Sequence, residues 1–331
     1  MKRLLVVLIL LTLLAIAALP ALAGTVNTDR LAPGWRLMSP TTSPAPRASQ
    51  AMAYDSARGV AVLFGGTDGW TTFSDTWEWS SALLQWSQKF TTHVPPSRYG
   101  HAMVYDEARG VVVMFGGNGS GGGNYMNDLW EFDGSDWSEI VTVNAPSERW
   151  LHAMAYDPDR QVTVLHSGTW GLTVAGDTWE YANGNWVAQD IVNPGPPYRY
   201  GEGLAYDGQR GVMVLFGGHD DGYTEFNETW ERVGSGDWTR VYPTQNPARR
   251  YRFGFVYNER IHLPFLFGGL ADVFFGDVNI YNGQKWKGGV FSPGPAGRCC
   301  LAMVYDTTRQ AVFLFGGSVG GLENNESWYF R

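Results

Sequence analysis

The sequence predicts an all-β protein built from six copies of one structural unit. Three observations lead to this prediction. A group of residues recurs with a period of about 50 residues, the chain contains 42 glycines and 15 tryptophans, and short apolar runs alternate with glycine-containing turns. Of the 331 residues, 17% are charged and 44% are apolar, which is typical of a folded globular chain rather than a disordered one.

Each copy of the repeat begins with an arginine. A short apolar segment, a turn that contains a second arginine, and a Gly-Gly doublet follow it. The copy led by Arg98 continues with the segment 102–106, Arg109 and the doublet Gly116-Gly117. One copy departs from the pattern, because it reads Ser167-Gly168 where the others have two glycines. The six leading arginines are Arg47, Arg98, Arg149, Arg199, Arg250 and Arg298.

Every copy predicts four short strands. In the first copy the first strand covers residues 51–54, and residues 55–59 form a tight turn whose Asp and Gly suit such a turn. The second strand is the apolar run 60–64, which glycines bound as expected of a strand buried on both faces. The third strand carries residues 75–79, and the fourth begins at Trp86.

The tryptophans that begin the fourth strands predict how the sheets close into a ring. Five copies have such a tryptophan, whereas the sixth copy stops after its third strand, at residues 328–331. A segment over residues 35–38 stands before the first copy, in the sequence context of a fourth strand. We therefore predict a six-bladed β-propeller over residues 35–331, with four antiparallel strands per blade. The N-terminal strand near Trp35 completes blade 6, which leaves only short, protected sheet edges.

The repeated arginine and Gly-Gly doublet resemble the kelch-repeat β-propeller family, over about residues 35–331. In kelch proteins that bind peptides, an arginine at this position often lines the ligand face, and the resemblance extends this expectation to the leading arginines. Two enzyme types on this scaffold were compared. The copper site of galactose oxidase needs a cysteine cross-linked to tyrosine and two histidines, for which the sequence has no motif. Sialic-acid mutarotases resemble the chain in overall plan, without a matching residue motif.

The first 23 residues predict a signal peptide. Two basic residues precede an apolar run over 4–19, and Ala21-Leu22-Ala23 provides a small-x-small cleavage site. The run is shorter than the roughly 20 residues of a membrane-spanning helix, although an uncleaved anchor is the alternative. We expect cleavage before Gly24, a short N-terminal segment over 24–34, and a secreted or periplasmic protein with no membrane insertion after cleavage.

Charge and cysteine content exclude further classes. The net charge is −8, which disfavours nucleic-acid binding because that requires a basic surface. Cys299 and Cys300 are adjacent and are the only cysteines, so they provide no disulfide framework. No cluster of histidine, cysteine and carboxylate residues has metal-site spacing, and we predict no metal, no cofactor and no catalytic residue. Sequons at Asn118, Asn227 and Asn325 matter only if the host glycosylates exported proteins.

A ligand site is predicted on the face that carries the longer loops, because variable loops on a rigid scaffold usually bind ligands. Aromatic residues follow the leading arginine only in blades 2 to 5, which suggests a second constraint in that sector. We place the site on blades 2–4. Alternatively, each leading arginine pairs with the acid that begins the third strand of its blade, and the aromatic residues fill the channel mouth. The predicted binding residues are Arg98, Arg149, Arg199, Trp150, Trp170, Tyr99 and Tyr200.

These features favour an exported binding module over an enzyme. Aromatic faces beside guanidinium groups suit a protein, peptide or carbohydrate ligand. We expect the module to be a monomer without catalytic activity. The alternative function is a sugar-acid mutarotase or epimerase that resembles the kelch-type sialic-acid mutarotases.

Overall fold

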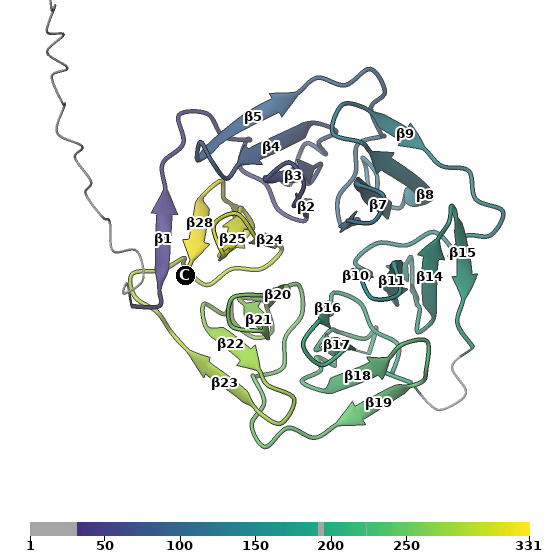
Figure 1. Cartoon of the computed structure of the whole chain (residues 1–331), viewed down its shortest axis with the longest axis vertical. Coiled ribbons are helices and arrows are strands. Elements are labelled where there is room, and N and C mark those ends of the chain that lie inside the picture. The colour runs from purple at the N-terminus through teal and green to yellow at the C-terminus, as the bar shows by residue number, and fades with distance from the viewer. Residues whose placement is uncertain (1–31, 191–194, 223) are drawn as a thin grey trace, which may run out of the picture. The chain divides into compact units, whose positions relative to one another are not determined.

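Six four-stranded antiparallel sheets form a ring in the unit Pro33–Arg331 (Figure 1). The computed structural model describes residues 32–190, 195–222 and 224–331, and the signal peptide predicted over residues 1–23 lies outside this part of the chain. The predicted six-bladed β-propeller is confirmed. Among the described residues, no helix has the length and apolar character needed to cross a membrane.

The strands of blades 1 to 3 follow one another from the centre of the ring outward. Blade 1 contains β2 (Ala51–Asp55), β3 (Val60–Phe64), β4 (Thr76–Ser80) and β5 (Gln85–Lys89). Blade 2 contains β6 (Ala102–Asp106), β7 (Val111–Asn118), β8 (Tyr125–Phe132) and β9 (Trp137–Glu139). Blade 3 contains β10 (Ala153–Asp157), β11 (Val162–His166), β14 (Thr178–Ala182) and β15 (Asn185–Ala188), with the hairpin β12 (Thr169–Trp170) and β13 (Thr173–Val174) in its loop.

Blades 4 to 6 repeat this order. Blade 4 contains β16 (Gly203–Asp207), β17 (Val212–Phe216), β18 (Thr229–Val233) and β19 (Trp238–Val241). Blade 5 contains β20 (Gly254–Asn258), β21 (Leu263–Phe267), β22 (Val278–Tyr281) and β23 (Trp286–Gly289). Blade 6 contains β24 (Ala302–Asp306), β25 (Ala311–Phe315), β28 (Ser327–Phe330) and β1 (Trp35–Met38), with the hairpin β26 (Ser318–Val319) and β27 (Leu322–Glu323) in its loop.

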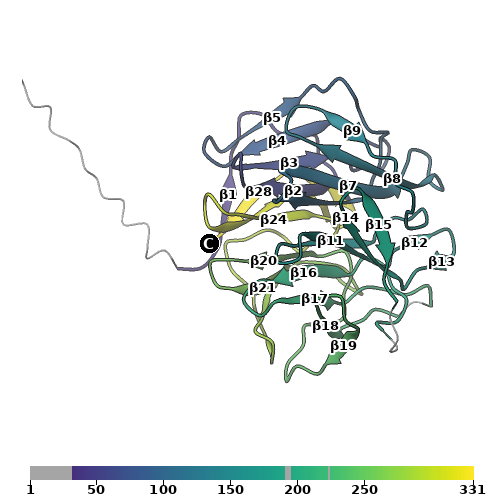
Figure 2. The same ribbon diagram turned by 45° about the vertical axis from the view of Figure 1, so that its right-hand side comes forward.

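The strands alternate in direction, so the connections gather on two faces of the ring (Figure 2). We call one of them the loop face; it carries the connections between second and third strands and the segments that lead from one blade into the next. We call the other the turn face; it carries the short turns after the first and third strands.

The second strand of each blade is the most buried. Val62, Leu63 and Phe64 of β3 have no exposed surface, because neighbouring blades cover the sheet on both sides. In the fourth strand Trp86 is buried, whereas Ser87 and Gln88 are both exposed, as expected of the outermost strand of a blade. The continuous apolar run in the sequence thus corresponds to the doubly covered strand.

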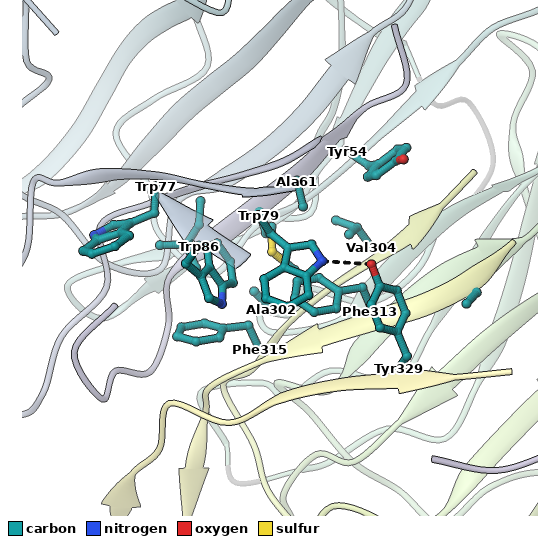
Figure 3. Packing of buried hydrophobic residues seen from close by; sticks show 13 residues of the cluster. Tyr54, Ala61, Trp77, Trp79, Trp86, Ala302, Val304, Phe313, Phe315 and Tyr329 are labelled. Carbon is teal, nitrogen blue, oxygen red and sulfur yellow. Dashed lines mark hydrogen bonds between the residues drawn. The ribbon is translucent and has the colours of Figure 1, made fainter. Parts of the chain in front are cut away.

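Tryptophans fasten neighbouring blades to one another, and Figure 3 shows the junction of blades 1 and 6. The ring of Trp79 stacks on Phe313, with centroids 4.8 Å apart and an interplanar angle of 17°. Its indole Nε1 donates a hydrogen bond to the Tyr329 hydroxyl at 2.9 Å (Figure 3). Trp86 likewise donates to Ser327 Oγ at 2.9 Å. Blade-to-blade contact therefore combines aromatic packing with satisfied indole donors.

The ring closes through strand β1, as the sequence predicted. Trp35 pairs with Phe330 and Leu37 with Trp328 in an antiparallel register. The side chain of Trp35 is 4% exposed, and its ring meets Phe267 of blade 5 edge-on at 4.7 Å between centroids. Blade 6 is thus built from both ends of the described chain.

The turn face is stabilised by ion pairs and tyrosine hydrogen bonds. Arg58 donates to Asp55 at 2.6 Å and to Glu78 at 2.5 Å, which ties the first turn to the third strand. Tyr54 donates through its hydroxyl to Asp306 of the neighbouring blade at 2.8 Å. A cavity of about 460 Å³ opens along the inner strands at this end.

Deletion of residues 24–40 should strongly destabilise the propeller, because it removes the pairing partner of β28 and the aromatic contacts of Trp35. Truncation of a buried tryptophan alone costs about 3–5 kcal/mol, so we expect a much lower Tm or aggregation in a thermal melt followed by circular dichroism. A chain that starts at Pro33 keeps β1 and should melt like one that starts at Gly24. If the chain without residues 24–40 had the same Tm as the chain that starts at Gly24, this result would contradict closure by β1.

Candidate functional site

The leading arginine of each blade is buried under the loop face. Arg98 has no exposed surface. Its Nε donates to the Pro96 carbonyl at 3.0 Å, its Nη1 donates to the Gly116 carbonyl at 3.0 Å, and Asp128 accepts two further bonds at 2.7 and 2.6 Å. We call this arrangement the arginine clasp. The corresponding ion pairs elsewhere are Arg47–Asp75, Arg149–Asp177, Arg199–Glu228, Arg250–Asp277 and Arg298–Glu326.

The carboxylate of Asp128 is held in its charged form. Burial by itself would raise the pKa of Asp128, but the hydrogen bonds and charge of Arg98 outweigh it and lower the pKa. Arg98, Arg149 and Arg199, which we predicted as ligand donors, are therefore engaged inside their own blades. Their burial and partners match the alternative role, in which each arginine holds the loops of its blade together. None of the three arginines lines the aromatic cavity on the loop face.

The Gly-Gly doublet allows the clasp of the next blade to approach closely. Gly116 has a φ of +65°, and a Cβ at this position would lie 2.7 Å from the carbonyl oxygen of Arg149, so a side chain fits there only if the neighbouring backbone shifts. Blade 3 has Ser167 at this position, with a φ of +61°. The Ser167 hydroxyl lies 2.5 Å from the carbonyl oxygen of Arg199 in a hydrogen bond, which compensates for the strained backbone.

The second residue after each leading arginine belongs to a ring of hydrogen bonds at the neck of the central channel. Each of these residues donates its backbone N–H to the carbonyl of the equivalent residue in the preceding blade. All six have φ between +54° and +65°, although only two are glycines. We call this the neck ring. Its members are Ser49, Gly100, Leu151, Gly201, Arg252 and Cys300, joined by N···O distances of 2.7–2.8 Å.

The third residue after each arginine lies just below the neck ring, around a cavity of about 120 Å³. These residues are buried although several are polar. Burial, followed by the charge of Arg149, lowers the pKa of His152 to about 3, so this imidazole is neutral near pH 7. Glu202 lies 3.3 Å from Nδ1 of the buried His166. The six residues are Gln50, His101, His152, Glu202, Phe253 and Leu301.

The first residue after each leading arginine lies at the loop face. In blades 2 to 5 this residue has an aromatic side chain. Trp150 and Tyr200 line a cavity of about 270 Å³ together with His219 and Arg252. The Arg252 guanidinium lies 5.5 Å from the centroid of the Trp150 ring. His219 stands between two tyrosines, with centroids 5.2 Å from Tyr200 and 4.9 Å from Tyr251. We call this cavity the aromatic hollow. Its remaining lining is Thr169, Gly171, Leu172, Val174, Asp220 and Asp221.

The structure brings together only part of the predicted aromatic set. Tyr99 packs beside the hollow, with its ring perpendicular to Trp150 at 5.5 Å between centroids, and its hydroxyl accepts a hydrogen bond from Asn118 at 3.1 Å. Trp170 does not line the hollow; its ring lies 5.8 Å from the Arg149 guanidinium. Asn118, the first sequon, is buried.

Sequence reasoning missed Arg252, His219 and the acidic pair Asp220-Asp221. Arg252 carried a signal, because the second position after the leading arginine holds serine, glycine or leucine in four of the other blades. His219 also carried a signal, because it directly follows the Gly-Gly doublet of its blade, where the other blades have threonine, asparagine, leucine or serine. The hollow therefore lies between blades 3 and 4, with a contribution from blade 5, rather than being centred on blades 2–4.

Comparisons with known proteins give partial similarity. No family model matches the chain. Over 141 residues, or 37% of the chain, it is 27% identical to Mei4-dependent protein 6 of Schizosaccharomyces pombe. Over 175 residues, or 47% of the chain, it is 28% identical to Adagio-like protein 1 of Oryza sativa subsp. japonica. The chain aligns with 19% and 26% of the length of these two curated relatives.

Replacement of His152 by glutamine, the residue that blade 1 carries at this position, should flatten the acid dependence of stability. The unfolded chain binds a proton at His152 below pH of about 6.5, whereas the folded chain resists protonation down to about pH 3. The contribution of His152 to the free energy of unfolding therefore falls as the pH drops from about 6.5 towards 3, by up to about 1.4 kcal/mol per pH unit.

Denaturant titrations between pH 4.5 and 7.5 measure this effect. The difference in unfolding free energy between parent and His152→Gln should be constant above pH 6.5 and should shift in favour of the variant as the pH falls. A difference that does not change with pH would contradict the burial of a neutral imidazole.

Proposed function

We propose that this chain is an exported kelch-type binding module, which presents its loop face to a protein, peptide or carbohydrate ligand at the aromatic hollow. One observation carries the proposal: aromatic rings and side chains of both charge signs surround a cavity of about 270 Å³ on the loop face. Concave, largely apolar sites with a few convergent polar groups are the usual form of a ligand site.

The chemistry of the hollow suits a ligand with a flat or apolar face and polar substituents. Trp150 and Tyr200 offer ring surfaces for stacking. Arg252 supplies donors, and Asp220 and Asp221 supply acceptors. A peptide side chain or a sugar ring combines these features.

Exposed apolar side chains on the loop face support a macromolecular ligand. Leu172, at the tip of the β12–β13 hairpin and in the lining of the hollow, is 94% exposed, and Trp70 in the loop of blade 1 is 97% exposed. Phe90, Val141 and Val143, in segments that lead from one blade into the next, are also largely exposed. Most of the exposed large apolar side chains in the described residues lie on loops of this face, so a ligand larger than the hollow would meet further apolar side chains there.

The kelch assignment and export rest on the sequence. The period of about 50 residues with its leading arginine and Gly-Gly doublet supports the former, and the basic, apolar and small-x-small order of residues 1–23 supports the latter. The propeller itself is the type of scaffold on which loops carry binding. The proposal includes no catalytic step.

Trp150→Ala should weaken binding by about 2 kcal/mol or more, as expected of a buried aromatic anchor, which is roughly thirtyfold in affinity. Glycan and peptide arrays would first identify a ligand, and calorimetry would then compare variants. Leu83→Ala is the control, because Leu83 is an exposed apolar residue on the turn face.

Two results would contradict the proposal. One is a Trp150→Ala variant that melts like the parent and binds its ligand equally well. The other is acceleration of the anomer exchange of sialic acid by substoichiometric protein in an NMR experiment, which would indicate a mutarotase instead of a binding module.

A further inference from the structure

The two cysteines lie at the channel neck, on the same side as the aromatic hollow. Cys299 is the first residue after the leading arginine of blade 6, and Cys300 is a member of the neck ring. Their Sγ atoms are 2.7 Å apart, and both thiols are free. Cys300 is partly exposed and lines the neck cavity, while Cys299 is buried. The thiol pair therefore borders the neck cavity through Cys300.

The backbone holds the two thiols in this arrangement. Cys299 exchanges two backbone hydrogen bonds with Ser318, at 3.1 and 2.8 Å. Cys300 donates to the Arg252 carbonyl and accepts from the Ser49 N–H, both at 2.8 Å. These four hydrogen bonds fix the backbone of both residues, and the two side chains are turned toward each other, with their sulfurs in contact. A fixed juxtaposition of this kind accelerates reaction between the two groups.

A guanidinium stands beside the Cys300 thiol. Nη1 of Arg252 lies 3.8 Å from Sγ of Cys300. The hydrogen bond from Cys299 comes first and the charge of Arg252 adds to it, and together they lower the pKa of Cys300 although burial opposes the change. The same contact raises the pKa of Cys299. Reactive cysteines occupy electropositive, partly exposed sites of this kind.

We propose that Cys299 and Cys300 form a redox-active dithiol that closes to a vicinal disulfide by exchange with a small soluble disulfide. The Cys300 thiolate attacks one sulfur of the oxidant, breaks its S–S bond and releases the first thiolate. Cys299 loses its proton, attacks Sγ of Cys300 and releases the second thiolate. The cysteines lose two electrons and two protons, and the oxidant gains them as two thiols.

Closure of the disulfide would change the charge around the hollow. Arg252 faces the Cys300 sulfur and also lines the aromatic hollow. In the disulfide form Cys300 carries no thiolate, so Arg252 has a stronger unpaired positive charge toward a ligand. This consequence rests on the proposed binding function, whereas the disulfide itself does not.

The test treats the reduced full chain with hydroxyethyl disulfide, followed by alkylation in denaturant and mass spectrometry. The parent should lose two hydrogens, take up no alkylating agent and yield one peptide with Cys299 and Cys300 linked. Cys299→Ala and Cys300→Ser are matched variants, because blade 1 carries Ala48 and Ser49 at these positions. Cys299→Ala should stop at a mixed disulfide, and Cys300→Ser should react at least roughly tenfold more slowly, since the attacking thiol is missing.

Three outcomes would overturn the proposal. These are a parent that stays fully alkylatable, a parent that stops at the mixed disulfide as Cys299→Ala does, and disulfides that link two chains. Ligand binding measured on the reduced and oxidised parent keeps the two proposals apart. A disulfide that forms without any effect on ligand binding would leave the redox site standing and remove only its link to the hollow.

Discussion

The arginine clasp is the interaction on which the rest of the structure depends. In each blade it joins the segment that enters the first strand, the end of the second strand and the acid that begins the third, as Arg98 does with Pro96, Gly116 and Asp128. Hydrogen bonds to charged groups contribute about 1.5–3 kcal/mol each when desolvated, so the loop face has a rigid base although it consists of loops. The buried charge is acceptable only because every clasp supplies its carboxylate.

The positions that follow the clasp explain how one repeat produces three different layers. The first residue lies at the loop face, the second enters the neck ring, and the third lines the channel below. Repetition fixes where these side chains lie but not what they are, and the variation among blades therefore gives each layer its chemistry. Aromatic residues at the first position create the hollow, and Arg252 and Cys300 at the second bring charge and a thiol to its edge. Packing constrains the scaffold while the three layers remain free to differ.

The sequence predicted the architecture well because the architecture is periodic. The number of blades follows from the spacing of the leading arginines. Closure of the ring follows from Trp35, which precedes the first copy of the repeat and matches the tryptophan that begins a fourth strand. Both features depend only on the order of residues along the chain. The direction in which the leading arginines point was not predictable. The same sequence, such as Arg149 followed by Trp150, is compatible with a guanidinium that faces a ligand and with one that pairs with Asp177 of the same blade. The hollow was only partly predictable, since Trp150, His219 and Arg252 come from different blades and meet only through the ring.

The unfolding free energy of Arg98→Met tests the central role of the clasp most directly. Methionine keeps much of the volume but leaves the half-buried Asp128 without the Arg98 guanidinium, and loss of one member of a buried ion pair typically costs about 3–5 kcal/mol. Arg249→Met is the control, because the side chains of Arg249 and its partner Asp272 are 54% and 81% exposed, and exposed ion pairs contribute only about 0–1 kcal/mol. We predict a loss of stability in the first variant that far exceeds the loss in the second. A variant Arg98→Met that unfolds at the same denaturant concentration as the parent would contradict the account.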